Sequence, residues 1–189
     1  MLGRLLAAPF GSIWNLKTIC YRRRNGFSSK LARLVYQLYQ YENNSSVAWN
    51  SSFAGEPCFP HGMKSIFISG DAKIGQNCVI FQQVTIGSIT LSGSARNGAP
   101  TIGNNVYIGA GAKIVGNVVI GNNVRIGANA VVHRDVPDNS VVVAGEQKVI
   151  QKNSALDNRY FSSVGGQRMY FDNGKWIPCP SQERLQKTA

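Results

Sequence analysis

Aliphatic and aromatic residues return at every sixth position through the middle of the chain. The lead residues of these hexads are Val47, Phe53, Phe59, Ile68, Ile74, Ile80, Ile86, Ile102, Ile108, Ile114, Ile120, Ile126 and Val132. A small or modest side chain follows most leads by four positions, and Asn or Gly is common in between. Because strand side chains alternate between faces, the lead and the fourth residue after it can both point inward. The intervening pair can turn a corner, since Asn and Gly tolerate left-handed backbone angles.

Three hexads of this kind predict one triangular coil of about 18 residues, and the thirteen leads predict roughly four stacked coils. The sequence therefore predicts an all-β solenoid, a parallel β-helix, over residues 47–150. A β-sandwich is the alternative, but nothing in a sandwich would keep the repeat in phase. The phase breaks twice, between Phe59 and Ile68 and between Ile86 and Ile102. We expect the polar, Gly-rich stretch of the second break to leave the coil as an extruded loop over residues 88–101.

Two shorter segments flank the solenoid. Residues 1–46 predict a helical arm, because Leu31, Leu34, Val35 and Leu38 repeat at helical spacing. Its first apolar stretch is broken by Pro and Gly, which favours a packed segment over a signal peptide. Residues 151–189 predict a β-hairpin and a tail, because Asn173-Gly174 separates two apolar runs.

Charge is concentrated in the arm. The chain has 189 residues and a net charge of +11, and residues 1–41 hold seven Lys or Arg and no acid. A solvated basic arm is one interpretation, and attraction to an anionic membrane face or an acidic polymer is the other. No nucleic-acid-binding motif accompanies the charge, so we expect no nucleic-acid partner. Four cysteines without metal spacing fit free thiols and a cytoplasmic protein, either free or at the inner face of the membrane.

Only two histidines can supply an imidazole base near pH 7, His61 and His133. His61 lies in the first irregular coil, where it could be catalytic or merely packed. His133 occupies an outward position of the last hexad, where a solvated side chain is expected. A zinc site would need about three convergent histidines, so no metal is expected.

The stretches PHGMKSIFISGDAKIGQNCVIFQQVTIG and GAPTIGNNVYIGAGAKIVGNVVIGNNVRIGANAVVHRDVPDNSVVVAG resemble the hexapeptide-repeat acyltransferases, and among them the serine acetyltransferase-like O-acetyltransferases. The resemblance covers about residues 56–150. It implies a left-handed β-helix, a homotrimer, acetyl-CoA as the acetyl donor and no metal. It also implies that His61 is the catalytic base.

Further residues are expected to complete the site because of their size, charge or position. Acetyl-CoA is expected between two subunits, along Thr85, Gly87, Gly109, Ala110, Gly127, Ala128, Arg134 and Lys148. An N–H near Thr85–Gly87 or in the loop is expected to hold the oxyanion. Arg96, in the loop, is the expected contact to an acidic acceptor.

The chain departs from the serine enzymes at the acceptor site. Pro60 stands where they place an Asp, and Gly98-Ala99-Pro100 stands where they carry Arg-His-Pro. These departures favour O-acetylation of a sugar hydroxyl in a capsular polysaccharide, lipopolysaccharide or exopolysaccharide, with an acidic polysaccharide as one form of the acceptor. The alternatives are serine O-acetylation, acetylation of a small xenobiotic, and a catalytically silent scaffold.

Overall fold

The hexads wind into a three-sided column. The computed structural model describes residues 2–22, 27–91, 93–145, 149–164 and 167–179. Face A pairs β1 (Ser46–Val47), β3 (Phe67–Ile68), β6 (Thr85–Gly87), β9 (Lys113–Val115) and β12 (Val131–Val132) in parallel. Face B pairs β2 (Ser52–Phe53), β4 (Lys73–Ile74), β7 (Thr101–Ile102) and β10 (Val119–Ile120), also in parallel. Face C pairs β5 (Val79–Ile80), β8 (Tyr107–Ile108), β11 (Arg125–Ile126) and β13 (Ser140–Val142) in the same way.

The lead residues stack on one another from coil to coil. Ile68 lies in register with Ile86, and Ile86 with Ile114. From Ile68 to Val132 every lead is buried, as are the small residues four positions later. Phe53 and Phe59 are half-buried against the same core. The predicted parallel solenoid is therefore confirmed, and its core is a continuous stack rather than a globule.

Asparagines hold the corners between faces B and C. Asn77, Asn105, Asn123 and Asn139 all have φ between 55° and 57°. The side-chain amide of each of the first three donates to the side-chain oxygen of the next, at 3.0, 3.1 and 3.1 Å. Each Asn thus supplies both the left-handed backbone that the corner needs and one rung of a ladder between coils.

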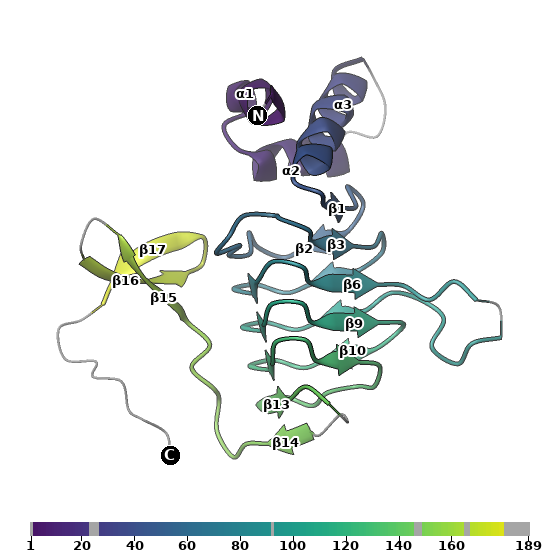
Figure 1. The fold of residues 1–189 in the computed structure, drawn as a ribbon, viewed down its shortest axis with the longest axis vertical. Coiled ribbons are helices and arrows are strands. Elements are labelled where there is room, and N and C mark those ends of the chain that lie inside the picture. Colours follow the sequence, from purple (N-terminus) through teal and green to yellow (C-terminus); the bar gives the residue numbers. More distant parts are fainter. Residues whose placement is uncertain (1, 23–26, 92, 146–148, 165–166, 180–189) are drawn as a thin grey trace.

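A helical cap covers the N-terminal end of the column (Figure 1). It consists of α1 (Leu2–Ala7), the short 3-10 helix η1 (Ala8–Phe10), α2 (Ile13–Arg22) and α3 (Phe27–Glu42). Lys17 fastens α2 to the first coil, because its buried ammonium donates to the Ser51 carbonyl at 2.6 Å and lies 4.7 Å from the centre of the Phe53 ring. The predicted helical arm is confirmed.

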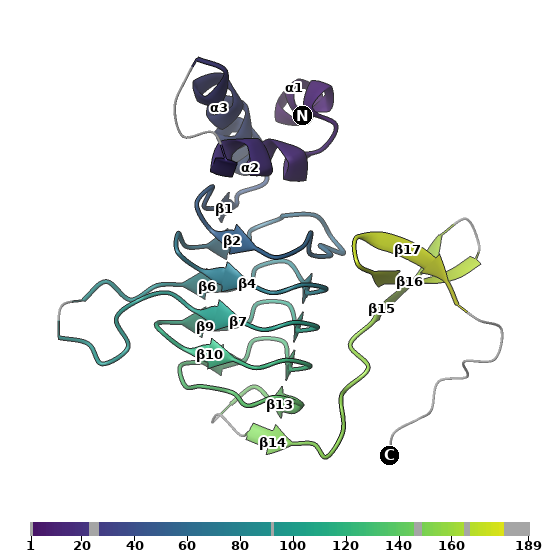
Figure 2. The same ribbon diagram turned by 180° about the vertical axis from the view of Figure 1, so that it is seen from behind.

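The chain after the last coil reverses and returns. β14 (Val149–Gln151) pairs antiparallel with β13. The chain then runs beside face C to an antiparallel sheet of β15 (Tyr160–Val164), β16 (Gln167–Asp172) and β17 (Lys175–Pro178). β16 and β17 turn at Asn173-Gly174, where a hairpin was predicted, while β15 is a strand that the pattern did not indicate. Both views place this sheet beside the first coils (Figures 1 and 2).

Two absences hold for the described ranges. No helix there is long and apolar enough to cross a bilayer. The same residues contain no cluster of three or more His, Cys, Asp or Glu that could hold a metal ion.

Candidate functional site

His61 lies at the corner between faces C and A. We call this the His61 corner, formed by residues 59–66, 81–84, 109–112 and 127–130 of successive coils. The three additional residues between Phe59 and Ile68 form its uppermost turn, in which the Gly62 N–H donates to the Phe59 carbonyl at 3.0 Å with Gly62 at φ 71°. This turn carries the exposed His61 imidazole outward from the column.

A polar hollow of about 460 Å³ opens beside the imidazole. It is lined by His61, Lys64, Ser65, Gln82 and Gln83. The Gln82 side-chain oxygen is buried, and no hydrogen-bond donor reaches it among the described residues. The lining includes the exposed ammonium of Lys64 and no carboxylate. The hollow therefore combines an imidazole, an unsatisfied acceptor and a positive charge.

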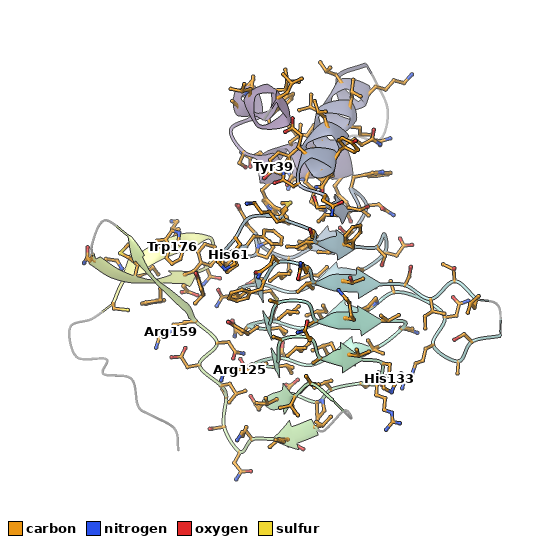
Figure 3. The ribbon with its side chains drawn as sticks, viewed as in Figure 1. Tyr39, His61, Arg125, His133, Arg159 and Trp176 are labelled. Carbon is orange, nitrogen blue, oxygen red and sulfur yellow. The ribbon has the colours of Figure 1, made fainter. Side chains whose placement is uncertain are left out.

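Aromatic residues support the other side of His61. The His61 and Phe81 rings meet edge-on with their centres 5.8 Å apart. Phe81 in turn contacts Tyr160 at 5.9 Å, and Tyr160 contacts Trp176 at 5.8 Å. Figure 3 shows Trp176 next to His61. The C-terminal sheet is thereby attached to the site through a chain of ring contacts, which the sequence analysis missed.

A second, more apolar hollow of about 270 Å³ lies behind the His61 turn. Phe59, Pro60 and Gly62 contribute to its wall, together with Phe171 and Trp176 of the C-terminal sheet. Glu56 also lines it, and partial burial raises the pKa of this carboxyl. Pro60, which stands where the serine enzymes place an Asp, thus borders an apolar space with one carboxylate at its edge.

The small residues predicted to bind the donor lie on the His61 corner, one coil apart. Gly109 and Ala110 follow β8, and Gly127 and Ala128 follow β11. The prediction assumed that these glycines leave room for the donor. Gly109 has a different reason to be Gly, because an added Cβ would lie 2.6 Å from the Ala128 backbone nitrogen. Ala128 is exposed and Ala110 half-buried, so a ligand could still lie against both.

Two of the backbone N–H groups predicted to hold the oxyanion already donate hydrogen bonds within the chain. The Thr85 N–H donates to the Ala112 carbonyl at 2.9 Å, because Thr85 is part of a strand rather than a turn. In the loop, the Gly98 N–H donates to Ile89 at 2.9 Å. At Gly87, the end of β6, an added Cβ would make an ordinary contact with the Thr85 side chain at 3.6 Å.

The remaining predicted residues lie elsewhere. His133 and Arg134 are exposed on the corner between faces A and B, which we call the loop corner because residues 88–100 leave the column there. Figure 3 shows His61 and His133 on opposite sides of the column. Arg96 is already paired with Asp135 at 2.9 Å, which ties the loop to the last coil. Lys148 lies outside the described residues.

The comparisons with known proteins agree with this architecture. Residues 99–134 match the family model "Bacterial transferase hexapeptide (six repeats)". A serine acetyltransferase of Helicobacter pylori (strain 26695) is 32% identical over 138 residues, which cover 71% of this chain and 79% of the relative. This chain belongs to the serine acetyltransferase family. A Staphylococcus xylosus member of the family is 36% identical over 157 residues, 83% of this chain.

Solved structures of the family support the same conclusion. The Neisseria gonorrhoeae serine acetyltransferase matches with a TM-score of 0.64 at 28% identity, covering 77% of this chain and 55% of that one. The soybean serine acetyltransferase complexed with serine matches with a TM-score of 0.62 at 26% identity, covering 73% of this chain and 56% of that one. These matches and the hexapeptide family imply the left-handed winding of the β-helix.

Coverage of the relatives is partial. The chain spans 36% of a Synechococcus elongatus serine acetyltransferase, 61% of a Bacillus pumilus one and 66% of the Staphylococcus xylosus one.

The relatives also correct the predicted acceptor. They are serine acetyltransferases, so the prediction of a polysaccharide O-acetyltransferase is wrong, and the serine alternative is the one they favour. That prediction gave decisive weight to Pro60, Gly98 and Ala99. The structure shows that the first lies on the His61 corner and the other two at the base of the loop. Three substitutions therefore do not outweigh the similarity to serine acetyltransferases, which extends over most of the chain.

Proposed function

We propose that this protein transfers an acetyl group from acetyl-CoA to the hydroxyl of serine. The observation that carries the proposal is the position of His61, which stands exposed beside a polar hollow on the corner that also carries Ala110 and Ala128. The relatives and the serine-complexed neighbour support serine as the acceptor.

In the proposed reaction, a nitrogen of His61 takes the hydroxyl proton as the serine oxygen attacks the thioester carbonyl. The new C–O bond replaces the C–S bond, coenzyme A leaves as the thiolate, and the imidazolium returns the proton to that sulfur. Lys64 at the hollow's edge favours an anionic group such as the acceptor carboxylate, and the unsatisfied Gln82 oxygen favours a donor such as its ammonium. The residues that replace the Asp and Arg of the serine enzymes are thus proposed to be Gln82 and Lys64.

We also propose that the protein works as a homotrimer. His61 projects from one corner, whereas the loop and Arg134 project from another. One chain therefore does not bring them together, but a neighbouring copy could present its loop corner to the His61 corner. In such an assembly Arg134 would approach the donor from the neighbour. Light scattering tests this, with the mass of three chains as the expected result and a monomer as the contradicting one.

The activity is tested by release of free thiol from acetyl-CoA in the presence of L-serine. His61→Ala should lower the rate by about 10²–10⁴-fold, the typical contribution of a general base. Asn153→Ala is the control, because Asn153 is exposed at a bend beside the corner between faces B and C, away from both other corners, and its rate should stay near wild type. No serine-dependent release by the wild type, or equal loss in both variants, would overturn the proposal.

A further inference from the structure

The helical cap exposes an apolar surface that no other described residue covers. On α3, Leu31, Leu34, Leu38 and Tyr41 repeat at spacings of three and four residues and so share one helix face. Leu34 is 62% exposed and Tyr41 is 85% exposed. The face that packs inward is a different one, containing Ala32, Val35 and Tyr36. Packing among the described residues therefore uses one apolar stripe of α3 and leaves most of the second exposed, since Leu31, Leu34 and Tyr41 face solvent and only Leu38 is half-buried.

The adjoining helix α1 presents a similar stripe. Leu2, Leu5 and Leu6 are all exposed, with Leu5 at 70%. α1 lies close against α3, because a Cβ on Gly3 would come within 2.8 Å of the Tyr39 backbone, and the Gly3 N–H donates to the Glu42 carboxylate at 3.1 Å. The two helices form the outer end of the molecule (Figures 1 and 2). Exposed leucines on both make this end apolar.

An apolar hollow adjoins the stripe of α1. It measures about 940 Å³ and lies between the helical cap and the His61 turn. Leu5 forms part of its wall, with Ala7, Ala8 and Ile13. Hydrocarbon is the ligand chemistry that such a lining favours.

Charge decides between the partners that such a surface could bind. Residues 1–41 hold seven basic residues and no acid, and Glu42 closes α3, so the cap carries a formal charge of +6. Arg22 at the end of α2 and Lys30 at the start of α3 are both exposed. A second cap packed on these leucines would bring like charges together, whereas an anionic lipid surface attracts them, by about 1 kcal/mol for each Lys or Arg near the membrane. Helices with leucines on one side and basic residues around them are typical of segments that lie in the bilayer interface.

We propose that the helical cap docks on anionic lipid bilayers through the exposed leucines of α1 and α3. Binding holds the column with its capped end on the bilayer and leaves the lower coils in solvent. The interaction is peripheral, since it buries leucine side chains and no spanning segment. It does not depend on the proposed acetyl transfer.

The test is co-sedimentation of the full chain with vesicles of phosphatidylcholine, with and without phosphatidylglycerol. We expect at least about tenfold stronger partitioning onto the anionic vesicles, weakening as salt screens the charge. The double variant Leu5→Ser with Leu34→Ser should lose about tenfold in partitioning, because two apolar side chains no longer enter the interface. Leu91→Ser is the matched control, since Leu91 is 72% exposed in the loop, and it should bind like wild type.

A second variant keeps the test decisive if the leucine variant fails to fold. Arg22→Gln with Lys30→Gln removes two exposed charges and should weaken binding to anionic vesicles only. Absence of vesicle binding, or equal binding to both vesicle types, would overturn the proposal. So would a fall in oligomeric mass caused by the leucine substitutions, measured by light scattering without lipid, because the surface would then join copies of the chain.

Discussion

The burial of Lys17 allows its effect on the stability of the fold to be predicted in magnitude. Burial lowers the pKa of this ammonium from 10.5 to about 8, and the nearby Cys20 opposes that change. Only 4% of the residue is exposed. A fall of about 2.5 in pKa corresponds to about 3.4 kcal/mol of penalty for the charged form in the folded state.

The sign of the pH dependence follows from proton binding. Below about pH 8 both states hold the Lys17 proton, and the penalty is fully present. Between about pH 8 and 10.5 the unfolded chain binds more protons than the folded one, so the free energy of unfolding rises with pH. By about pH 9.5 the free energy of unfolding of the wild type should have risen by about 2 kcal/mol because of Lys17.

Lys17→Met removes the titrating group but also leaves the Ser51 carbonyl without its donor. Losing that bond costs about 1–3 kcal/mol, which is less than the penalty that the substitution removes. At pH 7 the variant should therefore be more stable than wild type, by up to about 2 kcal/mol. The difference in free energy of unfolding between Lys17→Met and wild type should then fall by about 2 kcal/mol at pH 9.5. Urea unfolding followed by tryptophan fluorescence at the two pH values measures this. Lys30→Met, which removes an exposed lysine, is the control. A difference between Lys17→Met and wild type that does not change with pH would refute the reasoning.

Three further changes test the column. Asn105→Ala should cost about 2–3 kcal/mol in urea unfolding, because it removes two ladder bonds and a residue suited to φ 56°, while Asn153→Ala at an exposed bend should cost almost nothing. Equal effects would contradict the ladder. Gly109→Ala should destabilise by about 1–3 kcal/mol in urea unfolding, because its Cβ would lie 2.6 Å from backbone. Gly87→Ala is its control and should be neutral, because its Cβ would meet nothing closer than 3.6 Å. Arg96→Gln should change stability by less than about 1 kcal/mol, since its ion pair is exposed, yet speed proteolysis within the loop; an unchanged cleavage rate would show that the pair does not hold the loop.

The sequence determined most of the column because the hexad is a local rule repeated many times. Each lead isoleucine indicates the same inward position, so a lead that is only half-buried, such as Phe59, does not obscure the period. The corner positions could also be predicted from their asparagines, since few other residues accept the left-handed backbone angle.

The surroundings of His61 were less predictable. Phe81 directly follows the lead Ile80, at a position where the repeat usually places Gly, and this departure was a signal that something packs there. Its partners, Tyr160 and Trp176, lie far along the chain, and no period relates them to it. Contacts of this kind depend on where the returning segment docks, which local patterning does not determine.

β14 has a consequence for how the protein stays a discrete particle. A parallel ladder of identical coils offers, at its last rung, unpaired backbone groups that match the first rung of another molecule. β14 runs against the direction of β13 and covers that edge on face C. The helical cap covers the opposite end of the column. Removing residues 149–151 from their pairing would thus leave β13 with unpaired backbone groups that could pair with the same edge of a second molecule, so the strand protects solubility as much as it completes the fold.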